Sequence, residues 1–217
     1  MNGVEVVISD FGGVLTTPLL GAFAAMQDSH GIPLDALGKA MRHATEAADG
    51  ANPLYELEKG AISEAEFLRR IGVGLETALG HAIDLHGYGE GFFSHLHPND
   101  ELFAYLRSLL DRRLRMAILT NNVREWEPLW RSMLPIDEIF ELVVDSAFVG
   151  MRKPDPRIYE LTLERLGIAP QAAVFLDDLE ANCEAARAVG MQAVWFRSNE
   201  QAIADLEAVI ADPVRAS

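Results

Sequence analysis

Five side chains that could do chemistry stand where elements begin or end in this sequence. Apolar runs typical of buried strands stop at Asp10, at Thr120 and at the pair Asp177-Asp178, and Lys153 stands just before a helix start. Open α/β sheets place their ligands at the carboxyl ends of parallel strands. We therefore expect these side chains to meet at one edge of a sheet.

Asp177 and Asp178 follow one another at the end of a strand, and two adjacent carboxylates suit a hard cation such as Mg²⁺. Each residue also has an ordinary structural explanation. Carboxylates favour helix N-termini, a threonine often caps an element, and a lone lysine is usually solvated. For single residues the structural explanation is favoured, whereas the ordered set favours a site.

The set resembles the four motifs of the haloacid dehalogenase-like hydrolase superfamily. Residues 10–15, 152–159 and 175–182 are similar to the branch that contains the phosphatase-type domain at the amino terminus of soluble epoxide hydrolases and bacterial sugar-phosphate phosphatases. The resemblance covers nearly the whole chain and is weakest between about residues 16 and 96. It implies phosphoryl transfer from a small phosphorylated metabolite through an aspartyl-phosphate.

The resemblance also implies a role for each residue. Asp10 is the expected nucleophile and, with the backbone carbonyl of Gly12, a ligand of Mg²⁺. Asp178 is expected to bind the metal directly, and Asp177 directly or through water. Three further residues are expected to hold the phosphoryl group or neutralise its charge, and Asn182 to orient a loop or ligand. These three are Thr120, the backbone of Asn121, and Lys153.

Gly12 is the departure from the phosphatase pattern, because such enzymes usually carry a second Asp two residues after the nucleophile. That Asp protonates the leaving alcohol and activates water, and general acid–base catalysis is commonly worth about 10²–10⁴ in rate. Either another group replaces it, or the substrate has a good leaving group. Glu46, Glu56, Glu58 and the six histidines are candidates that sequence alone does not rank.

Two alternatives remain beside the phosphatase. The first is a slow or non-catalytic domain that binds Mg²⁺ and phosphate, or a partner. The second is a 2-haloacid dehalogenase, which also lacks the second Asp but works without a metal. The pair Asp177-Asp178 disfavours the dehalogenase.

Strand patterns that alternate with helix patterns predict a doubly wound, parallel, Rossmann-like α/β sheet of about five strands. Residues 1–15 and 98–217 would form this core, and residues 16–97 would form an inserted helical cap. Thr17-Pro18 and Ser63 read as helix starts. No element is assigned between residues 72 and 91 beyond a helix of uncertain end.

The chain has 217 residues and a formal charge of −15, which argues against a nucleic-acid partner. Cys183 is the only cysteine, and we expect it to be buried. No run is long enough to span a membrane and no leader pattern opens the chain, so a cytoplasmic protein is expected. The histidines of segment 81–97 lack metal-site spacing, and Trp126, Trp130 and Met133 are expected in the core.

Overall fold

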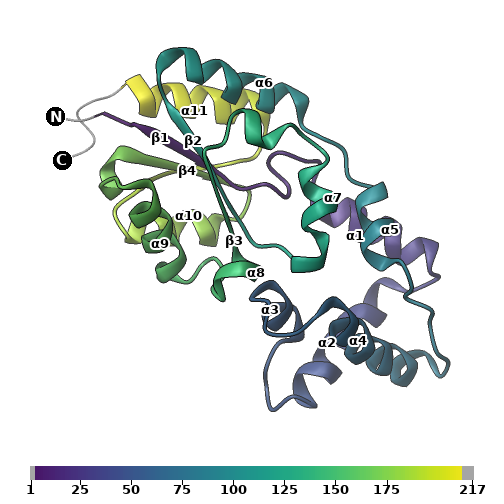
Figure 1. Cartoon of the computed structure of the whole chain (residues 1–217). Coiled ribbons are helices and arrows are strands. Elements are labelled where there is room, and N and C mark those ends of the chain that lie inside the picture. The colour runs from purple at the N-terminus through teal and green to yellow at the C-terminus, as the bar shows by residue number, and fades with distance from the viewer. Residues whose placement is uncertain (1–2, 212–217) are drawn as a thin grey trace.

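The computed structural model describes residues 3–211, the side chain of Leu34 excepted. Its centre is a parallel sheet of five strands in the order β3-β2-β1-β4-β5 (Figure 1). The strands are β1 (Val6–Ser9), β2 (Arg115–Thr120), β3 (Leu142–Asp145), β4 (Ala173–Asp177) and β5 (Gln192–Trp195). The predicted doubly wound parallel sheet is therefore confirmed.

Helices cover both faces of this sheet. Figure 1 shows α6 (Asp100–Leu109) and α11 (Asn199–Ala211) on one face, and α9 (Pro156–Leu166) and α10 (Glu180–Ala188) on the other. Alternation along the strands fits this arrangement, because Val7 packs in one buried cluster and Ile8 in the second. Apolar burial on both faces holds β1 at the middle of the sheet, with its carboxyl end between those of β2 and β4.

Five helices lie between β1 and α6. They are α1 (Leu19–Ser29), α2 (Leu34–Glu46), α3 (Pro53–Glu58), α4 (Glu64–Leu79) and α5 (Tyr88–Ser94). Thr16 and Pro98 pair in an isolated antiparallel bridge, so the chain leaves the sheet layer and returns to it at one place. We call residues 16–97 the helical insertion, and its treatment as a separate cap domain remains a prediction.

Capping residues that can be recognised in the sequence mark the starts of several helices. The side chains of Asn52, Ser63, Asn99 and Asp155 each accept a hydrogen bond from a backbone N–H of the first turn of α3, α4, α6 and α9. Such caps satisfy amides that have no partner inside the helix. Thr17 was expected to cap α1, and this prediction is wrong. Pro18 holds the cap position, and the Thr17 hydroxyl instead accepts a hydrogen bond from the backbone of His97.

Two helices were not predicted. Helix α5 begins after Gly87, which has a left-handed φ of 70° and no side chain that could cap the helix. The sequence therefore carries no capping signal for its start. Helix α8 (Ser146–Val149) is only one turn long. The helix expected over 125–134 is divided into a 3₁₀ turn (Arg124–Trp126) and α7 (Glu127–Arg131). Three more 3₁₀ turns complete the described chain, at Leu110–Arg112, Ile136–Glu138 and Pro170–Ala172.

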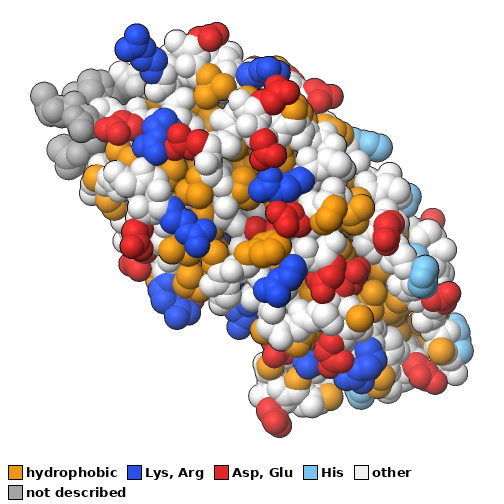
Figure 2. Space-filling model, viewed as in Figure 1, with side chains coloured by type: hydrophobic (Ala, Val, Ile, Leu, Met, Phe, Trp, Pro, Cys, Tyr) orange, Lys and Arg blue, Asp and Glu red, His pale blue; other side chains and the backbone are white. Residues whose placement is uncertain are grey.

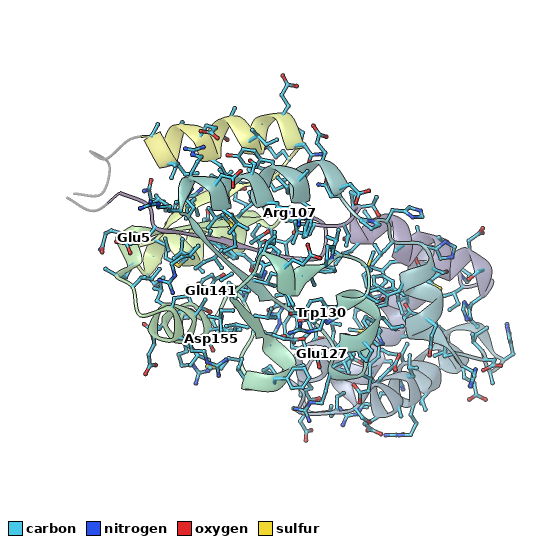
Figure 3. All side chains as sticks on the ribbon, turned by 45° about the horizontal axis from the view of Figure 1, so that its top comes forward. Glu5, Arg107, Glu127, Trp130, Glu141 and Asp155 are labelled. Atoms are coloured by element: carbon cyan, nitrogen blue, oxygen red, sulfur yellow. The ribbon has the colours of Figure 1, made fainter. Side chains whose placement is uncertain are left out.

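Packing bears out most of the core expectations. Cys183 is fully buried, and so is Trp130, which packs its ring 5.0 Å from that of Phe11 (centroid to centroid; Trp130 is labelled in Figure 3). Met133 is only partly buried against the core. Among the described residues, none of the helices combines the length and the hydropathy that a membrane crossing requires. The predicted fraying at the chain end falls mostly on residues 212–217, outside the described residues.

Asp145 is the last residue of β3, and its carboxylate is buried with only part of its hydrogen-bonding capacity used. One carboxylate oxygen accepts a hydrogen bond from Ala147 N at 2.9 Å, while the other is buried without a partner among the described residues. Burial raises the pKa of Asp145 from 3.8 to about 6. A carboxyl with a raised folded pKa binds its proton more tightly in the folded state, so stability falls as pH rises through that window.

We therefore expect Asp145→Asn to gain stability over the wild type as pH rises from about 4 to 6, following the raised pKa. The difference should grow by up to about 3 kcal/mol, since each pKa unit corresponds to about 1.4 kcal/mol. Urea unfolding of both proteins across this range measures it. A pH-independent difference would contradict an ionised, poorly solvated Asp145.

Candidate active site

The carboxyl end of β1 places Asp10 in a nearly closed position. The residue is 8% exposed, Oδ1 accepts a hydrogen bond from the backbone N–H of Phe11 at 2.7 Å, and Lys153 Nζ forms an ion pair with Oδ1 at 2.9 Å. Burial raises the pKa of this carboxyl, and the positive charge of Lys153 opposes the shift. Asp10 is thus held in one orientation beside a cation.

Lys153 joins two strand ends. It is 1% exposed, and its Nζ lies 2.6 Å from Asp177 Oδ2 as well as 2.9 Å from Asp10 Oδ1. Burial alone would lower its pKa, but attraction to the two carboxylates outweighs burial and raises the pKa. Lys153 is therefore a fixed, buried ammonium. It lies beside Asp10, where it was expected.

Asp177 has few lone pairs left for a metal. Oδ1 accepts from Leu179 N at 2.8 Å and from Asn182 Nδ2 at 2.9 Å, while Oδ2 accepts from Lys153. Asn182, which was expected to orient a loop or ligand, orients this carboxylate. Of the two readings left open for Asp177, contact with a metal through water fits these bonds better than direct contact.

Asp178 is freer than Asp177. No hydrogen bond to its carboxylate from another residue is found in the described chain, and burial together with Asp177 raises its pKa to about 6. Gly13 makes room for it, because a Cβ built on Gly13 would lie 2.4 Å from Asp178 Oδ2. Gly13 also has a φ of +78°, which disfavours any other residue there.

The three carboxylates form one cluster. Ligand oxygens of Asp10, Asp177 and Asp178 all lie within 4.8 Å of one another, and within residues 3–211 only Lys153 compensates their charge by an ion pair. An all-oxygen, negatively charged set is what Mg²⁺ prefers. The Gly12 carbonyl accepts no hydrogen bond from the described residues, so it is available to the same ion.

The carboxyl end of β2 contributes groups for an anion. Thr120 Oγ1 is buried and has no hydrogen-bond partner within residues 3–211. The Asn121 side chain is engaged instead, since it donates to Lys153 O at 3.0 Å and accepts from Lys153 N at 2.8 Å. It therefore positions the lysine, and only its backbone is left to meet a ligand. Whether Thr120, Asn121 and Lys153 bind substrate stays a prediction.

Position 12 faces a hydrocarbon. A Cβ built on Gly12 would lie 3.0 Å from Leu19 Cδ1 at the start of α1. An acid at position 12 would need the space that Leu19 fills. The sequence did not reveal this contact between Gly12 and Leu19, which lie seven residues apart.

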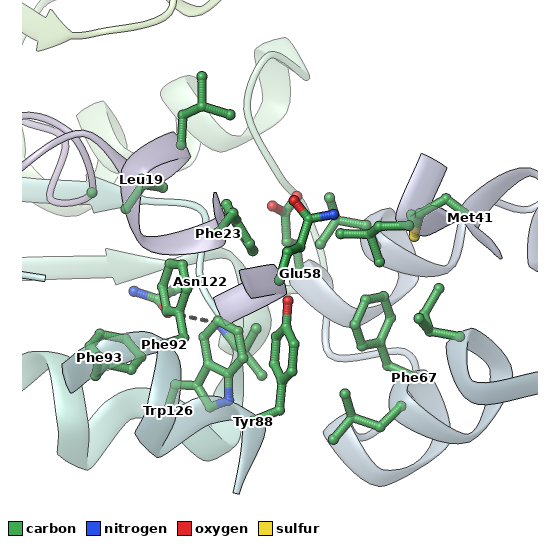
Figure 4. Close-up of a pocket in the computed structure, with 18 of the residues that line it drawn as sticks. Leu19, Phe23, Met41, Glu58, Phe67, Tyr88, Phe92, Phe93, Asn122 and Trp126 are labelled. Atoms are coloured by element: carbon green, nitrogen blue, oxygen red, sulfur yellow. Dashed lines mark hydrogen bonds between the residues drawn. The ribbon is translucent and has the colours of Figure 1, made fainter. Parts of the chain in front are cut away.

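A cavity of about 460 Å³ adjoins the site and extends into the helical insertion (Figure 4). Gly12, Thr16 and Asn121 line its inner end, and most of the remaining wall is aliphatic or aromatic. Trp126 is buried, as predicted, but it also forms part of that wall, which was not predicted. Figure 4 shows its ring beside those of Phe92 and Tyr88.

Of the candidates for a replacement acid, only Glu58 lines this cavity. Its Oε2 accepts a hydrogen bond from Arg152 Nε at 2.5 Å, and burial raises its pKa. The histidines lie elsewhere, and Figure 2 shows them at separate places along the helical insertion. Within the described residues, the carboxylates of Asp10, Asp177 and Asp178 form the one group with metal-site spacing.

Sequence reasoning missed Gln27 and Tyr88 as neighbours of the site. It named Glu58 only as an unranked acid, and Arg152 only as part of the motif 152–159. The positions of Gln27, Glu58 and Tyr88 depend on how α1, α3 and α5 fold over the sheet edge, and no short motif marks them. The apolar periodicity of α1 gave one usable signal, because Gln27 interrupts a face that otherwise reads as buried.

Comparison with known proteins gives a family and a range of relatives. A family model described as haloacid dehalogenase-like hydrolase matches residues 4–190. The chain is 30% identical over 215 residues to mouse acyl-CoA dehydrogenase family member 10, and 27% identical over 221 residues to mouse bifunctional epoxide hydrolase 2. These matches take in 96% and 95% of this chain but only 19% and 39% of the two relatives.

A further relative is a glyceraldehyde 3-phosphate phosphatase of Pyrococcus furiosus, 36% identical over 118 residues that make up 48% of each chain. Among solved structures, a HAD family enzyme of Bacteroides thetaiotaomicron superposes with a TM-score of 0.71 at 22% identity, covering 90% of this chain and 95% of that one. The same enzyme is also known in complex with magnesium and inorganic phosphate, with a TM-score of 0.67. These structures establish a common fold.

Proposed function

Because the chain belongs to the haloacid dehalogenase-like hydrolase family, we propose that it is a Mg²⁺-dependent phosphatase that hydrolyses a small phosphorylated metabolite through an aspartyl-phosphate. One observation carries the proposal. A buried ammonium, Lys153, is held between Asp10 and Asp177 at the sheet edge, beside the open carboxylate of Asp178. Phosphoryl transfer needs mainly positioning and neutralisation of charge, and this edge supplies both.

The donor set fits Mg²⁺. Asp10, Asp178 and the Gly12 carbonyl would hold the ion, and Asp177 would contact it through water. When bound, the ion would supply positive charge to the phosphoryl oxygens and relieve repulsion among the carboxylates. Lys153 would add a second positive charge, and the unpartnered Thr120 hydroxyl would donate to a phosphoryl oxygen.

The chemistry would then take two steps. An oxygen of Asp10 attacks phosphorus, the bond from phosphorus to the substrate's oxygen breaks, and the released alkoxide takes a proton from solvent water. A water molecule next attacks the same phosphorus and gives up a proton to solvent, the bond to Asp10 breaks, and inorganic phosphate leaves with the carboxylate restored. A hydrogen bond from Phe11 N and the ion pair with Lys153 fix the orientation of the Asp10 carboxylate for this attack.

The helical insertion would serve this chemistry as a cap. It encloses the apolar cavity beside the site, and Glu58 of α3 bonds to Arg152, the neighbour of Lys153. The relatives support the reaction class, since one is a glyceraldehyde 3-phosphate phosphatase and another is the phosphoserine phosphatase of Thermus thermophilus, 33% identical over 127 residues.

One observation favours a second candidate function, a slow or non-catalytic domain that binds metal and phosphate. Gly12 has no side chain, and a Cβ there would lie 3.0 Å from Leu19 Cδ1, so neither step has a proton carrier at position 12. The dehalogenase alternative is not favoured, because the carboxylate of a haloacid would meet three carboxylates and one lysine.

Turnover of p-nitrophenyl phosphate and acetyl phosphate, with Mg²⁺ and with chelator, tests the proposal. Both compounds have leaving groups that need little protonation. Metal-dependent release of phosphate from both supports a phosphatase. Absence of release from either, with Mg²⁺ still raising the melting temperature, would replace it with the binding function.

The environment of Gly12 leads to a specific prediction. Gly12→Asp alone should be limited by Leu19, whereas Gly12→Asp combined with Leu19→Ala should raise kcat on substrates with poor leaving groups by about tenfold or more, since an acid is commonly worth 10²–10⁴. Steady-state rates on alkyl and p-nitrophenyl phosphates measure this gain. Leu19→Ala alone is the control, and a double variant no faster than this control on alkyl phosphates would show that the proton comes from another group.

A further inference from the structure

The cavity beside the candidate active site offers very little to a charged ligand. No Lys, Arg or His is among the described residues that line it, and its one charged side chain, Glu58, is already paired with Arg152. A charged group placed deep in this cavity would lose its water without meeting an opposite charge. The wall is therefore suited to a neutral and largely apolar molecule.

Two polar side chains interrupt this wall without a partner. Gln27 of α1 and Tyr88 of α5 both line the cavity, and they are 8% and 7% exposed. Over residues 3–211, neither the Gln27 amide nor the Tyr88 hydroxyl makes a hydrogen bond to another group of the chain. Polar groups in largely buried residues usually have a hydrogen-bond partner, whereas the polar atoms of these two side chains open onto the cavity. These two groups therefore have bonds to offer to whatever fills the cavity.

Gln27 and Tyr88 lie at the same level of the cavity. Helices α1 and α5 pack against each other in opposite directions, with the rings of Phe23 and Phe92 at 4.6 Å and those of His30 and Tyr88 at 6.3 Å. Gln27 is one turn after Phe23 on α1, and Tyr88 is one turn before Phe92 on α5. Because the two helices run in opposite directions, both residues lie on the same side of the contact between Phe23 and Phe92. Figure 4 shows the Tyr88 hydroxyl pointing into the cavity.

The polar side chains nearer the sheet edge are different, because most of their hydrogen-bonding atoms already have partners. Thr16 Oγ1 accepts from Gly13 N at 3.0 Å, the Asn121 amide is bonded to the backbone of Lys153, and Asn122 Oδ1 accepts from Val123 N at 2.9 Å. Among the described residues, free capacity near the sheet edge remains on the Thr120 hydroxyl and on Asn122 Nδ2. In the helical insertion, Gln27 and Tyr88 offer it as a pair.

We propose that Gln27 and Tyr88 are specificity-determining residues that bind one neutral hydrogen-bonding group on the alcohol part of the substrate. That group is a hydroxyl, carbonyl or amide, and the rest of the alcohol is apolar. The inference rests on the proposed phosphatase function and names the class of phosphomonoester that the site takes. A polyol phosphate fits poorly, because its other hydroxyls would lie against hydrocarbon.

The chemistry of the pair matches a neutral group. The Gln27 amide supplies both donors and an acceptor, and the Tyr88 hydroxyl supplies one donor. Burial raises the pKa of Tyr88, so the hydroxyl keeps its proton at neutral pH. A ligand group that accepts a hydrogen bond from the Tyr88 hydroxyl could also form a hydrogen bond with the Gln27 amide, as donor or as acceptor. Such a group would give both side chains a partner.

The test compares n-alkyl phosphates with their terminal-hydroxyl counterparts over a series of chain lengths. We expect wild-type kcat/KM to favour the hydroxyl compound by about tenfold at one chain length, which corresponds to about 1.4 kcal/mol. Tyr88→Phe and Gln27→Leu should each bring this ratio close to one. The ratio is internal to each variant, so partial loss of folded protein cancels. Tyr105→Phe, whose hydroxyl bonds to Glu207 on α11, is the matched control and should keep the wild-type ratio.

Hydrolysis of acetyl phosphate distinguishes a failure of this inference from a failure of the proposed phosphatase function. If wild-type protein with Mg²⁺ hydrolyses acetyl phosphate but shows no preference for a hydroxyl at any chain length, the assignment of Gln27 and Tyr88 is overturned while the phosphatase stands. A preference that survives Tyr88→Phe and Gln27→Leu overturns it as well. If acetyl phosphate is not hydrolysed, the proposed function fails and this inference fails with it.

Discussion

Asp10→Asn should abolish phosphatase turnover, lowering kcat by about 10⁴-fold or more, because the amide cannot form a stable bond to phosphorus. The fold should survive the change. Burial already raises the pKa of Asp10, so a neutral side chain of the same shape removes a poorly solvated charge. Release of phosphate from acetyl phosphate measures the loss, and thermal melting measures the fold.

The same variant also tests where the metal binds. Asp178, Asp177 and the Gly12 carbonyl remain, so Mg²⁺ should still raise the melting temperature of Asp10→Asn, though less than in the wild type. Asp28→Asn, on the exposed side of α1, is the matched control and should leave both turnover and the effect of Mg²⁺ unchanged. Wild-type turnover in Asp10→Asn would exclude Asp10 as the nucleophile.

The sheet could be predicted from the sequence because its signals are local and strong. Runs such as 4–9, 116–120 and 173–176 are apolar and contain β-branched residues, and each stops at a polar side chain. Once the strands are known to be parallel, their carboxyl ends must share an edge, so Asp10, Thr120 and Asp177 had to come together. Caps such as Asp155 are equally local, since side chain and amide lie two residues apart.

Contacts between distant segments could not be predicted in this way. Leu19 reaches the Cβ position of Gly12, and Glu58 meets Arg152 across 94 residues of sequence. Each contact depends on the packing of the helical insertion over the sheet edge, and no periodicity specifies that packing. Helix α5 shows the same limit, because its start at Gly87 uses backbone geometry in place of a cap.

The roles of Asp177 and Asn121 show a subtler limit. Sequence placed both residues at the site, but the side-chain type alone did not say whether they face the ligand or their neighbours. In the structure, Asp177 is bonded to Lys153 and Asn182, and the Asn121 amide is bonded to the backbone of Lys153. Both therefore act first on Lys153, which makes the lysine the centre of the arrangement.

Lys153→Met is accordingly the substitution with the largest expected effect on stability. The methionine fills a similar volume, but Asp10 and Asp177 lose the ammonium at 2.9 Å and 2.6 Å. Breaking a buried ion pair from one side costs about 3–5 kcal/mol, because the remaining charge has no compensation. Urea unfolding at neutral pH in the absence of metal should show this loss, and turnover should fall with it.

The pH and metal dependence of the loss distinguish charge from packing. The charge of Lys153 lowers the pKa of Asp10 and of Asp178, so without it both pKa values would rise further in the folded state. The variant should therefore be least stable at high pH and should recover as pH falls and these carboxylates protonate. Mg²⁺ should also recover part of the stability, since it supplies the missing positive charge to the same oxygens. Lys39→Met is the matched control, because Lys39 pairs with Asp35 at the surface and such pairs are worth about 0–1 kcal/mol. If Lys153→Met lost no more than this control at any pH, the buried ammonium could not be what holds the three carboxylates together.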